Sequence, residues 1–224
     1  MMTRTKLCDR VLPDYTKGEE LFNTLSHTAG AVFGIVALIT CLFAAFRDGS
    51  PWSVTSAFIY GISLILLYTM SSLYHGLKHE TVKKVFQVID HCTIYLLIAG
   101  TYTPVMLCSV RKISPGWAWT IMGIVWGCAI VAAVLTAIDL KRFAIFSMIC
   151  YLGMGWCVVL AIKPTLQALP LTALLWILYG GISYTLGAIL YGLGKKHRYM
   201  HSLFHLFVLL GSILQYIAIF GYIL

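Results

Sequence analysis

Several histidines in this sequence are spaced in a way that suits metal binding. His201 and His205 are four residues apart, so on a helix their side chains lie on one face. His75 follows Ser71 at the same spacing. Asp90 lies near the start of an apolar stretch and is the only carboxylate in it. Neutral imidazole is a preferred zinc ligand, and catalytic zinc sites typically combine three protein ligands with a fourth position for water. These residue types therefore predict a zinc site built from three imidazoles and one carboxylate.

Hydrolysis is the chemistry that such a site would perform. A zinc ion lowers the pKa of its water to about 7, and a neighbouring carboxylate can accept the proton that the water loses. Asp90 is the candidate for that carboxylate, either as a direct ligand or through the water. Ser71 lies one helical turn before His75, where its hydroxyl could hydrogen-bond Asp90, the water or a developing oxyanion.

The spacing leaves alternatives open. His197, His201 and His205 form one row at four-residue intervals, so spacing does not decide which pair binds a metal. Ser71 has a second interpretation, a hydrogen bond to the backbone of its own helix. A single histidine at the edge of a membrane is often only a polar residue at headgroup level, so the prediction depends on several of them sharing one depth.

Other histidines have weaker claims to a functional role. His91 follows Asp90 and points about 100° away from it on a helix, which favours a supporting contact or packing over metal binding. His79 lies in a lysine-rich loop, as does the first histidine of the row, and we expect both to be solvated. His27, close to Asn23, would either support the site or pack between helices.

The elements that position these residues must lie in a membrane. Apolar residues make up 60% of the 224 residues and charged residues only 11%, against about 45–50% and about 25% in soluble proteins. The mean hydropathy is +0.87. Strand-like alternation at ten-residue spacing does not recur, which argues against a barrel. The composition therefore predicts an all-α membrane protein that crosses the bilayer several times.

Seven stretches are long enough for a transmembrane helix, which needs about 20 mostly apolar residues. The predicted spans are about 23–46, 52–75, 88–110, 116–137, 143–162, 170–193 and 202–223. Residues 21–224 would then form a seven-transmembrane-helix bundle, with the zinc site at its cytoplasmic side. Because the loops are short, neighbouring helices should be antiparallel.

The first 20 residues are predicted to form a cytoplasmic tail. They are polar and of mixed charge and lack the pattern of a signal peptide, so we expect the first span to stay in the membrane. A short interfacial helix over 4–20 is an additional possibility. Its apolar face would consist of Leu7, Val11, Leu12 and Tyr15.

Lysines and arginines set the predicted orientation, because the side that carries more of them faces the cytoplasm. Twelve lie in the N-terminal tail and in the loops that follow the second, fourth and sixth spans: Arg4, Lys6, Arg10, Lys17, Lys78, Lys83, Lys84, Lys141, Arg142, Lys195, Lys196 and Arg198. Four lie on the opposite side: Arg47, Arg111, Lys112 and Lys163. The N-terminus is therefore predicted in the cytoplasm and the C-terminus outside. His75, Asp90 and His201 then lie close to the cytoplasmic face.

The remaining features concern packing and partners. The net charge of +8 does not indicate nucleic-acid binding, because the basic residues lie in short clusters between apolar runs. Membrane lipid is the expected partner. Seven cysteines without CxxC spacing predict neither a disulfide framework nor a zinc ribbon. Pro104 is expected to kink its span within the preceding turn. Small residues predict close helix contact in the sixth span: Gly180, Gly181, Ser183, Gly187 and Gly192.

Three strings carry a resemblance to a known family. They are SSLYH (71–75), DHCTIYLLIAGTYTP (90–104) and HSLFH (201–205), which resemble the signature regions of the hemolysin III family. That family is grouped with the progestin and adipoQ receptors and the alkaline ceramidases. LFNTLSHTAGA (21–31) also resembles the opening helix of its bacterial members, so the likeness extends from about residue 19 to 224.

The resemblance implies a fold and a site. It implies seven helices, a cytoplasmic N-terminus and a zinc ion near the cytoplasmic face. By similarity the three histidine ligands are His75, His201 and His205. The aspartate that holds or activates the zinc water maps onto Asp90, and the serine of the family maps onto Ser71.

Three functions follow as hypotheses. The leading one is a zinc-dependent hydrolase of a lipid amide or ester bond, acting at the inner leaflet of a bacterial plasma membrane. The alternative is a non-enzymatic sensor or regulator of membrane homeostasis in which zinc is structural. A cytolytic pore is the third, and it has less support because no span carries the polar stripe that would line a wide channel.

Overall fold

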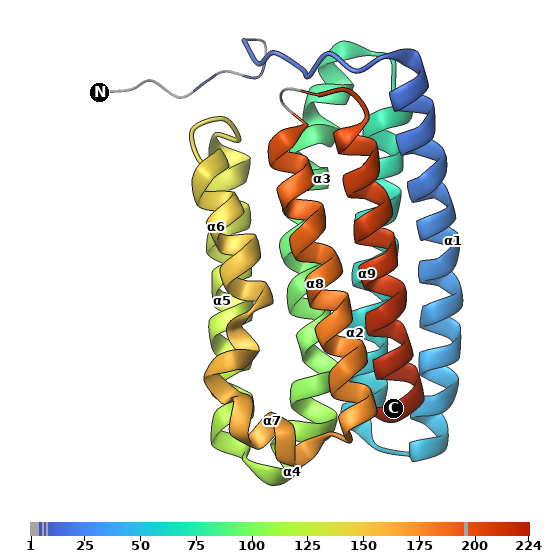
Figure 1. The fold of residues 1–224 in the computed structure, drawn as a ribbon, viewed down its shortest axis with the longest axis vertical. Helices are drawn as coiled ribbons and strands as arrows, with labels where there is room; N and C mark the ends of the chain where they lie inside the picture. The colour runs from blue at the N-terminus through green and yellow to red at the C-terminus, as the bar shows by residue number, and fades with distance from the viewer. Residues whose placement is uncertain (1–4, 6, 8, 195–196) are drawn as a thin grey trace.

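The fold was obtained as a computed structural model and consists of helices joined by short turns (Figure 1). The structure describes residues 5, 7, 9–194 and 197–224. The elements in chain order are α1 (Lys17–Asp48), α2 (Pro51–Gly76), α3 (Glu80–Pro104), the π-helical segment η1 (Val105–Val110), α4 (Arg111–Ile113), α5 (Pro115–Ile138), α6 (Ala144–Gly155), the 3-10 segment η2 (Cys157–Ala161), α7 (Ile162–Ala168), α8 (Leu171–Leu193) and α9 (Met200–Tyr222). Four residues in the charge count, Arg4, Lys6, Lys195 and Lys196, lie outside the described residues.

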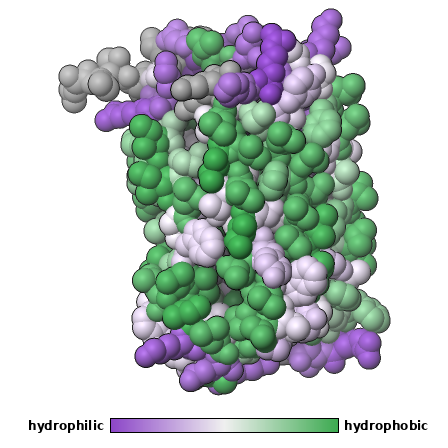
Figure 2. Space-filling model, in the orientation of Figure 1, coloured by the Kyte–Doolittle hydropathy of each residue, from purple (hydrophilic) through white to green (hydrophobic). Residues whose placement is uncertain are grey.

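Seven predicted spans are confirmed. Within the described residues, seven helical stretches are long and apolar enough to cross a membrane. On the face shown in Figure 2, hydrophobic residues form a broad belt and hydrophilic residues gather at the two ends of the bundle. That distribution is the one expected of helices whose outer surface faces hydrocarbon.

Two spans begin earlier than the sequence predicts. The first helix starts at Lys17, because Thr16 and Glu19 form a capping box in which Glu19 N donates to Thr16 Oγ1 at 3.2 Å and Thr16 N donates to Glu19 Oε2 at 2.8 Å. The third starts at Glu80, where the His79 side chain caps the helix. Apolar periodicity does not detect these polar first turns.

The short interfacial helix that the sequence offered as a possibility does not form in the part of the tail that is described. From residue 9 to Thr16 the backbone is not helical, and Thr16 is extended, with φ −67° and ψ 159°. Pro13 disfavours the helical conformation at Leu12. The tail instead runs as an extended strap across one end of the bundle (Figure 1).

The fifth span is broken rather than continuous. Its helix stops at Gly155 and resumes as a 3-10 turn and a short helix, so that the span covers Ala144–Ala168. Tyr102 of α3 satisfies the backbone at the break: its hydroxyl donates to Gly155 O at 2.9 Å and accepts from Val158 N at 2.9 Å. Unpaired backbone groups are costly at membrane depth, so this hydroxyl makes the interruption tolerable.

An irregular segment accompanies Pro104 in the third span, and the predicted kink of the helix axis stays a prediction. The irregularity follows the proline, as the π-helical segment Val105–Val110, and does not fall in the preceding turn. Proline has no backbone N–H to donate, and a wider turn accommodates the altered hydrogen-bond register. This segment is fully buried.

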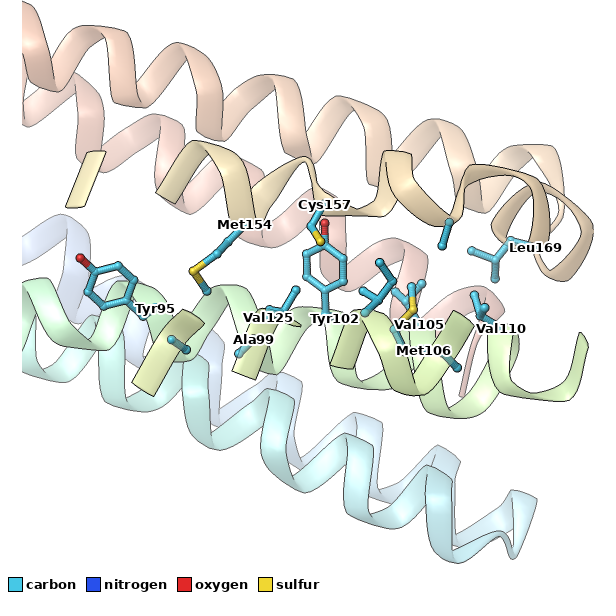
Figure 3. Packing of buried hydrophobic residues seen from close by; sticks show 14 of the residues in the cluster. Tyr95, Ala99, Tyr102, Val105, Met106, Val110, Val125, Met154, Cys157 and Leu169 are labelled. Carbon is cyan, nitrogen blue, oxygen red and sulfur yellow. The ribbon is translucent and has the colours of Figure 1, made fainter. Parts of the chain in front are cut away.

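Packing of the helices divides the core into two clusters. One joins α1, α2 and α9 around Tyr60, Leu64 and Tyr68. The other joins α3, η1 and α5 to the broken fifth span, and its members include Tyr95, Tyr102 and Met154 (Figure 3).

Small residues permit the close contact of α8 with α9, as predicted. A Cβ atom at Gly180 would lie 2.8 Å from the Gln215 side chain, and one at Gly187 would lie 3.2 Å from Phe207. Gly181 and Gly192 do not take part, since a Cβ atom there would meet nothing within 4 Å.

Candidate metal centre

Three histidine side chains converge near the end of the bundle at which the N-terminus lies. His75 comes from the last turn of α2, and His201 and His205 come from the first two turns of α9. His201 Nε2 lies 3.3 Å from His75 Nε2 and 3.1 Å from His205 Nε2. One nitrogen atom from each ring falls within 4.8 Å of the others, and all three residues are buried. The structure thus brings together the three histidines that the family resemblance assigns as ligands.

This donor set fits a metal ion. Nitrogen ligands about 2.0–2.1 Å from a tetrahedral zinc ion lie about 3.3 Å from one another. The nitrogen–nitrogen separations of 3.1 and 3.3 Å agree with that value. Buried imidazoles whose nitrogen atoms point at each other cannot all be satisfied by mutual hydrogen bonds, because each neutral ring has one donor and one acceptor.

The structure also shows which two histidines of the row at 197, 201 and 205 join the group. His201 and His205 face His75, whereas His197 is exposed and lies outside the group. His79 is likewise exposed, as expected for a loop histidine.

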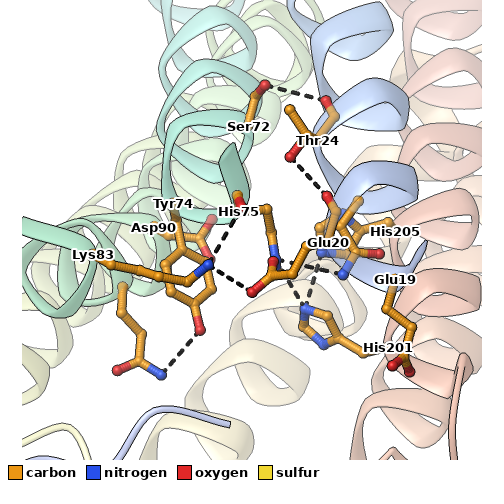
Figure 4. Close-up of polar contacts among 12 residues, drawn as sticks. Glu19, Glu20, Thr24, Ser72, Tyr74, His75, Lys83, Asp90, His201 and His205 are labelled. Carbon is orange, nitrogen blue, oxygen red and sulfur yellow. Dashed lines mark hydrogen bonds and ion pairs between the residues drawn. The ribbon is translucent and has the colours of Figure 1, made fainter. Parts of the chain in front are cut away.

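A carboxylate and an ammonium group support His75 from the first and third helices (Figure 4). Glu20 Oε2 lies 2.6 Å from His75 Nδ1, and Glu20 Oε1 accepts from Lys83 Nζ at 2.6 Å. Lys83 Nζ also donates to the backbone oxygen of His75 at 3.3 Å. Histidine ligands in metal sites usually donate their other N–H group to a carboxylate or carbonyl in this way.

Sequence reasoning missed Glu20 and Lys83. The available signal was on the first helix, where Glu20, Asn23 and His27 recur at intervals of three and four and so share one polar face of an apolar span. Asn23 is buried, and its Nδ2 lies 3.5 Å from His75 Nδ1. Lys83 gave no such signal, because it lies among other lysines in a loop-like stretch.

Asp90 and Ser71 lie beside the histidines. Both are buried, and Ser71 lies one turn before His75 on α2. Together with His201 they line the same cavity. The described group of converging ligand atoms consists of the three imidazoles, so a direct or a water-mediated bond from Asp90 to a metal stays a prediction.

His91 has a supporting position. Its Nδ1 lies 2.8 Å from the backbone oxygen of Gln87, so Nδ1 carries the proton and donates it. In the neutral ring Nε2 then accepts from the Tyr191 hydroxyl at 3.3 Å. His91 therefore anchors Tyr191 at the cavity wall and contributes no nitrogen to the metal group.

His27 lies directly behind one ligand. Its ring stacks on His205 at 3.7 Å between centroids, with an interplanar angle of 21°, and meets Tyr68 edge-on at 5.0 Å. It is buried, and neither ring nitrogen has a hydrogen-bond partner within the described part of the chain. His27 therefore packs between helices, and its ring also supports the His205 ring by stacking on it.

The extended tail covers the site. Tyr15 stacks on His201 with 4.9 Å between ring centroids and an interplanar angle of 23°, and it lies 5.5 Å from the His75 ring. Burial raises the pKa of the Tyr15 hydroxyl above its ordinary range. Further along the tail, Thr5 N donates to Asp139 Oδ2 at 2.8 Å, which attaches the strap to the turn between α5 and α6.

A cavity leads from the site into the bundle. Its volume is about 150 Å³, and it lies between α3, α6, α8 and α9. Asp90, Ser71 and His201 line it close to the metal centre, and most of its remaining wall is apolar. The broken segment at Gly155 and Trp156 forms part of that wall.

Comparison with known proteins places these features in a family. The family model described as "Haemolysin-III related" matches residues 15–216. "Hemolysin-3" of Bacillus cereus is 39% identical over 206 residues, 92% of each chain. "Hemolysin-3 homolog" of Bacillus subtilis (strain 168) is 36% identical over 208 residues, covering 93% of this chain and 96% of the relative. "Monocyte to macrophage differentiation factor" of Homo sapiens is 25% identical over 177 residues, covering 77% and 72% respectively.

Proposed function

The chain belongs to the haemolysin-III related family of multi-pass integral membrane proteins, and from that premise we propose that it is a zinc-dependent hydrolase of a lipid amide or ester bond. The observation that carries the proposal is the convergence of His75, His201 and His205 beside an apolar cavity, which is lined by one of them, His201, and by the buried carboxylate of Asp90. An apolar cavity with a few polar groups at one end suits a ligand with an acyl chain and a polar head.

The location that we propose is the bacterial plasma membrane, with the N-terminus in the cytoplasm. Twelve lysines and arginines on the N-terminal side against four on the other support this orientation. The similarity to two Bacillus relatives over nearly their whole length supports the bacterial membrane. The metal centre then lies at the depth of the inner leaflet.

The residues divide the chemistry among them. The three imidazoles would hold a zinc ion, which would supply Lewis-acid polarisation of a carbonyl group and a water that is a stronger nucleophile at neutral pH. Asp90 would accept the proton that the attacking water loses, and the Ser71 hydroxyl, which lines the same cavity, would hold that carboxylate. The apolar walls of the cavity receive the acyl chain and keep bulk water away from the reacting bond.

Turnover of defined lipids tests this proposal. The purified protein in detergent is given a fluorescent fatty amide and the matching ester, and product release is followed. We expect Asp90→Asn to retain its zinc and to lose at least about a hundredfold in rate, the usual contribution of a general base. Asp14→Asn is the matched control, since Asp14 is exposed on the tail, and its rate should equal that of the wild type. Full turnover in Asp90→Asn would remove the role given to that residue.

A structural role for the metal is the second candidate. It is favoured by one observation, that the ligands come from two helices, α2 and α9, which a bound ion would tie together. In that case chelation lowers the unfolding temperature, while neither the amide nor the ester is hydrolysed by the zinc-loaded protein. That combination of results would favour a sensor or regulator over the hydrolase.

A further inference from the structure

We propose that Glu20 is a positioning residue whose carboxylate makes His75 a metal ligand without itself binding the ion. The inference rests on the proposed function only in that a metal is held by the three histidines. It adds that the affinity of the centre depends on a residue of α1, although every ligand comes from α2 and α9.

The hydrogen-bond chemistry of the pair carries the first step. Glu20 Oε2 and His75 Nδ1 are 2.6 Å apart. An ionised carboxylate can only accept, so Nδ1 must carry the proton and donate it. In the neutral ring this leaves the lone pair on Nε2, the atom that lies 3.3 Å from His201 Nε2. The opposite tautomer would direct an N–H group into the space between the three rings and exclude a cation from it.

The carboxylate is itself held from a second side. Lys83 Nζ lies 2.6 Å from Glu20 Oε1 and also donates to the backbone oxygen of His75 at 3.3 Å. The Glu20 side chain is only 21% exposed, and that of Lys83 12%. Lys83 thus holds the Glu20 carboxylate in place relative to His75, and the carboxylate in turn orients the His75 ring. Three helices, α1, α2 and α3, meet in this arrangement.

An ordinary surface ion pair would not show this geometry. Exposed pairs are mobile and contribute little, whereas here each carboxylate oxygen has a different partner at 2.6 Å. The neighbouring Glu19 shows the contrast. Glu19 is buried, and its oxygens accept from Thr16 N at 2.8 Å and Tyr199 N at 2.7 Å, so it stabilises the start of α1 and the turn before α9.

A measurement of metal affinity distinguishes the proposed role of Glu20 from the structural role of Glu19. The purified full-length protein, stripped of metal, is titrated with Zn²⁺ and with Co²⁺ against a competing chelator. For Glu20→Ala we expect a 10–100-fold loss of affinity, the usual effect of removing a partner that orients a ligand. Glu20→Gln keeps the size of the side chain and one accepting oxygen, so its loss should be smaller. The visible absorption of the Co²⁺ form should change in both variants, because it reports the geometry of the ligands.

Matched controls show whether the effect is specific. Glu19→Ala should lower the unfolding temperature of the metal-free protein, because a helix cap is lost, while its metal affinity stays within about twofold of the wild type. Lys83→Met should lose less affinity than Glu20→Ala, since Lys83 acts through Glu20. The unfolding temperature of each metal-free variant identifies any that fails to fold, and Glu20→Gln remains as the conservative test.

Each result decides between the claims. Glu20→Ala or Glu20→Gln that binds Zn²⁺ and Co²⁺ as tightly as the wild type overturns the inference and leaves the proposed function standing. Equal losses in Glu19→Ala and Glu20→Ala also overturn it, because the effect is then general destabilisation. A wild type that binds neither metal overturns both claims. Affinity that depends on Glu20 in a protein without hydrolase activity supports the inference and overturns only the hydrolase.

Discussion

Tyr15 stacks on His201 with 4.9 Å between the ring centroids and an interplanar angle of 23°. A residue of the extended tail thereby covers the three converging histidines at the end of the bundle, while a cavity lined by His201 extends between α3, α6, α8 and α9. The centre is therefore closed by the tail and continuous with an apolar space inside the bundle.

Removal of the Tyr15 ring should open the centre to water. We expect a strong chelator to strip zinc from Tyr15→Ala several-fold faster than from the wild type, with the equilibrium affinity changed much less, because the ring covers the ligands without being one. Val11→Ala is the control, since Val11 lies on the same tail and is 90% exposed. Stopped-flow loss of metal to the chelator measures the rates. Equal rates in Tyr15→Ala and the wild type would show that metal leaves by another route.

Asp139 should make the attachment of the tail sensitive to acid. The N–H groups of Thr5 and Arg142, 2.8 and 3.1 Å from its carboxylate oxygens, lower the pKa of Asp139 to about 2, against about 3.9 in an unfolded chain. A lowered folded-state pKa stabilises the fold above the unfolded value, and that contribution is lost as the pH falls from about 4 to about 2. Thermal unfolding across this range should show a smaller pH dependence for Asp139→Asn, together with a lower stability at pH 7. Identical curves would mean that the tail is attached in another way.

The hydroxyl of Tyr102 should be needed for the break in the fifth span. Tyr102→Phe leaves Gly155 O and Val158 N without their partner, and an unsatisfied buried group costs about 1–3 kcal/mol. We expect a clearly lower unfolding temperature in detergent. Tyr179→Phe, at a side chain that is 50% exposed, should leave the temperature unchanged. A stable Tyr102→Phe protein would indicate that the broken segment finds other hydrogen-bond partners.

The seven spans and the grouping of the three histidines could be predicted because their signals are local. A transmembrane helix is recognised from about 20 consecutive apolar residues, and the spacing of His201 and His205 places both on one helical face whatever the tertiary structure. His75 could be added because the end of one span and the start of another lie at a common depth. Those arguments need no knowledge of which helices touch.

The features of the site that sequence reasoning missed depend mostly on contacts between distant segments. The break at Gly155 is stabilised by Tyr102, 53 residues away in the chain, and nothing in the apolar run around Gly155 indicates it. Glu20 reaches His75 across 55 residues, so its role appears only when α1 is packed on α2. The tail lacks a helix for a local reason, Pro13, but its place over the histidines follows from tertiary contacts.

The metal content of the purified protein tests the central claim most directly. Mass spectrometry of metals is applied to the wild type and to His75→Ala and His205→Ala, with the exposed His197→Ala as the control. We predict close to one zinc ion per chain in the wild type and in His197→Ala, and its loss from the other two variants. A folded wild type without stoichiometric metal, or zinc retained in both ligand variants, would contradict the account.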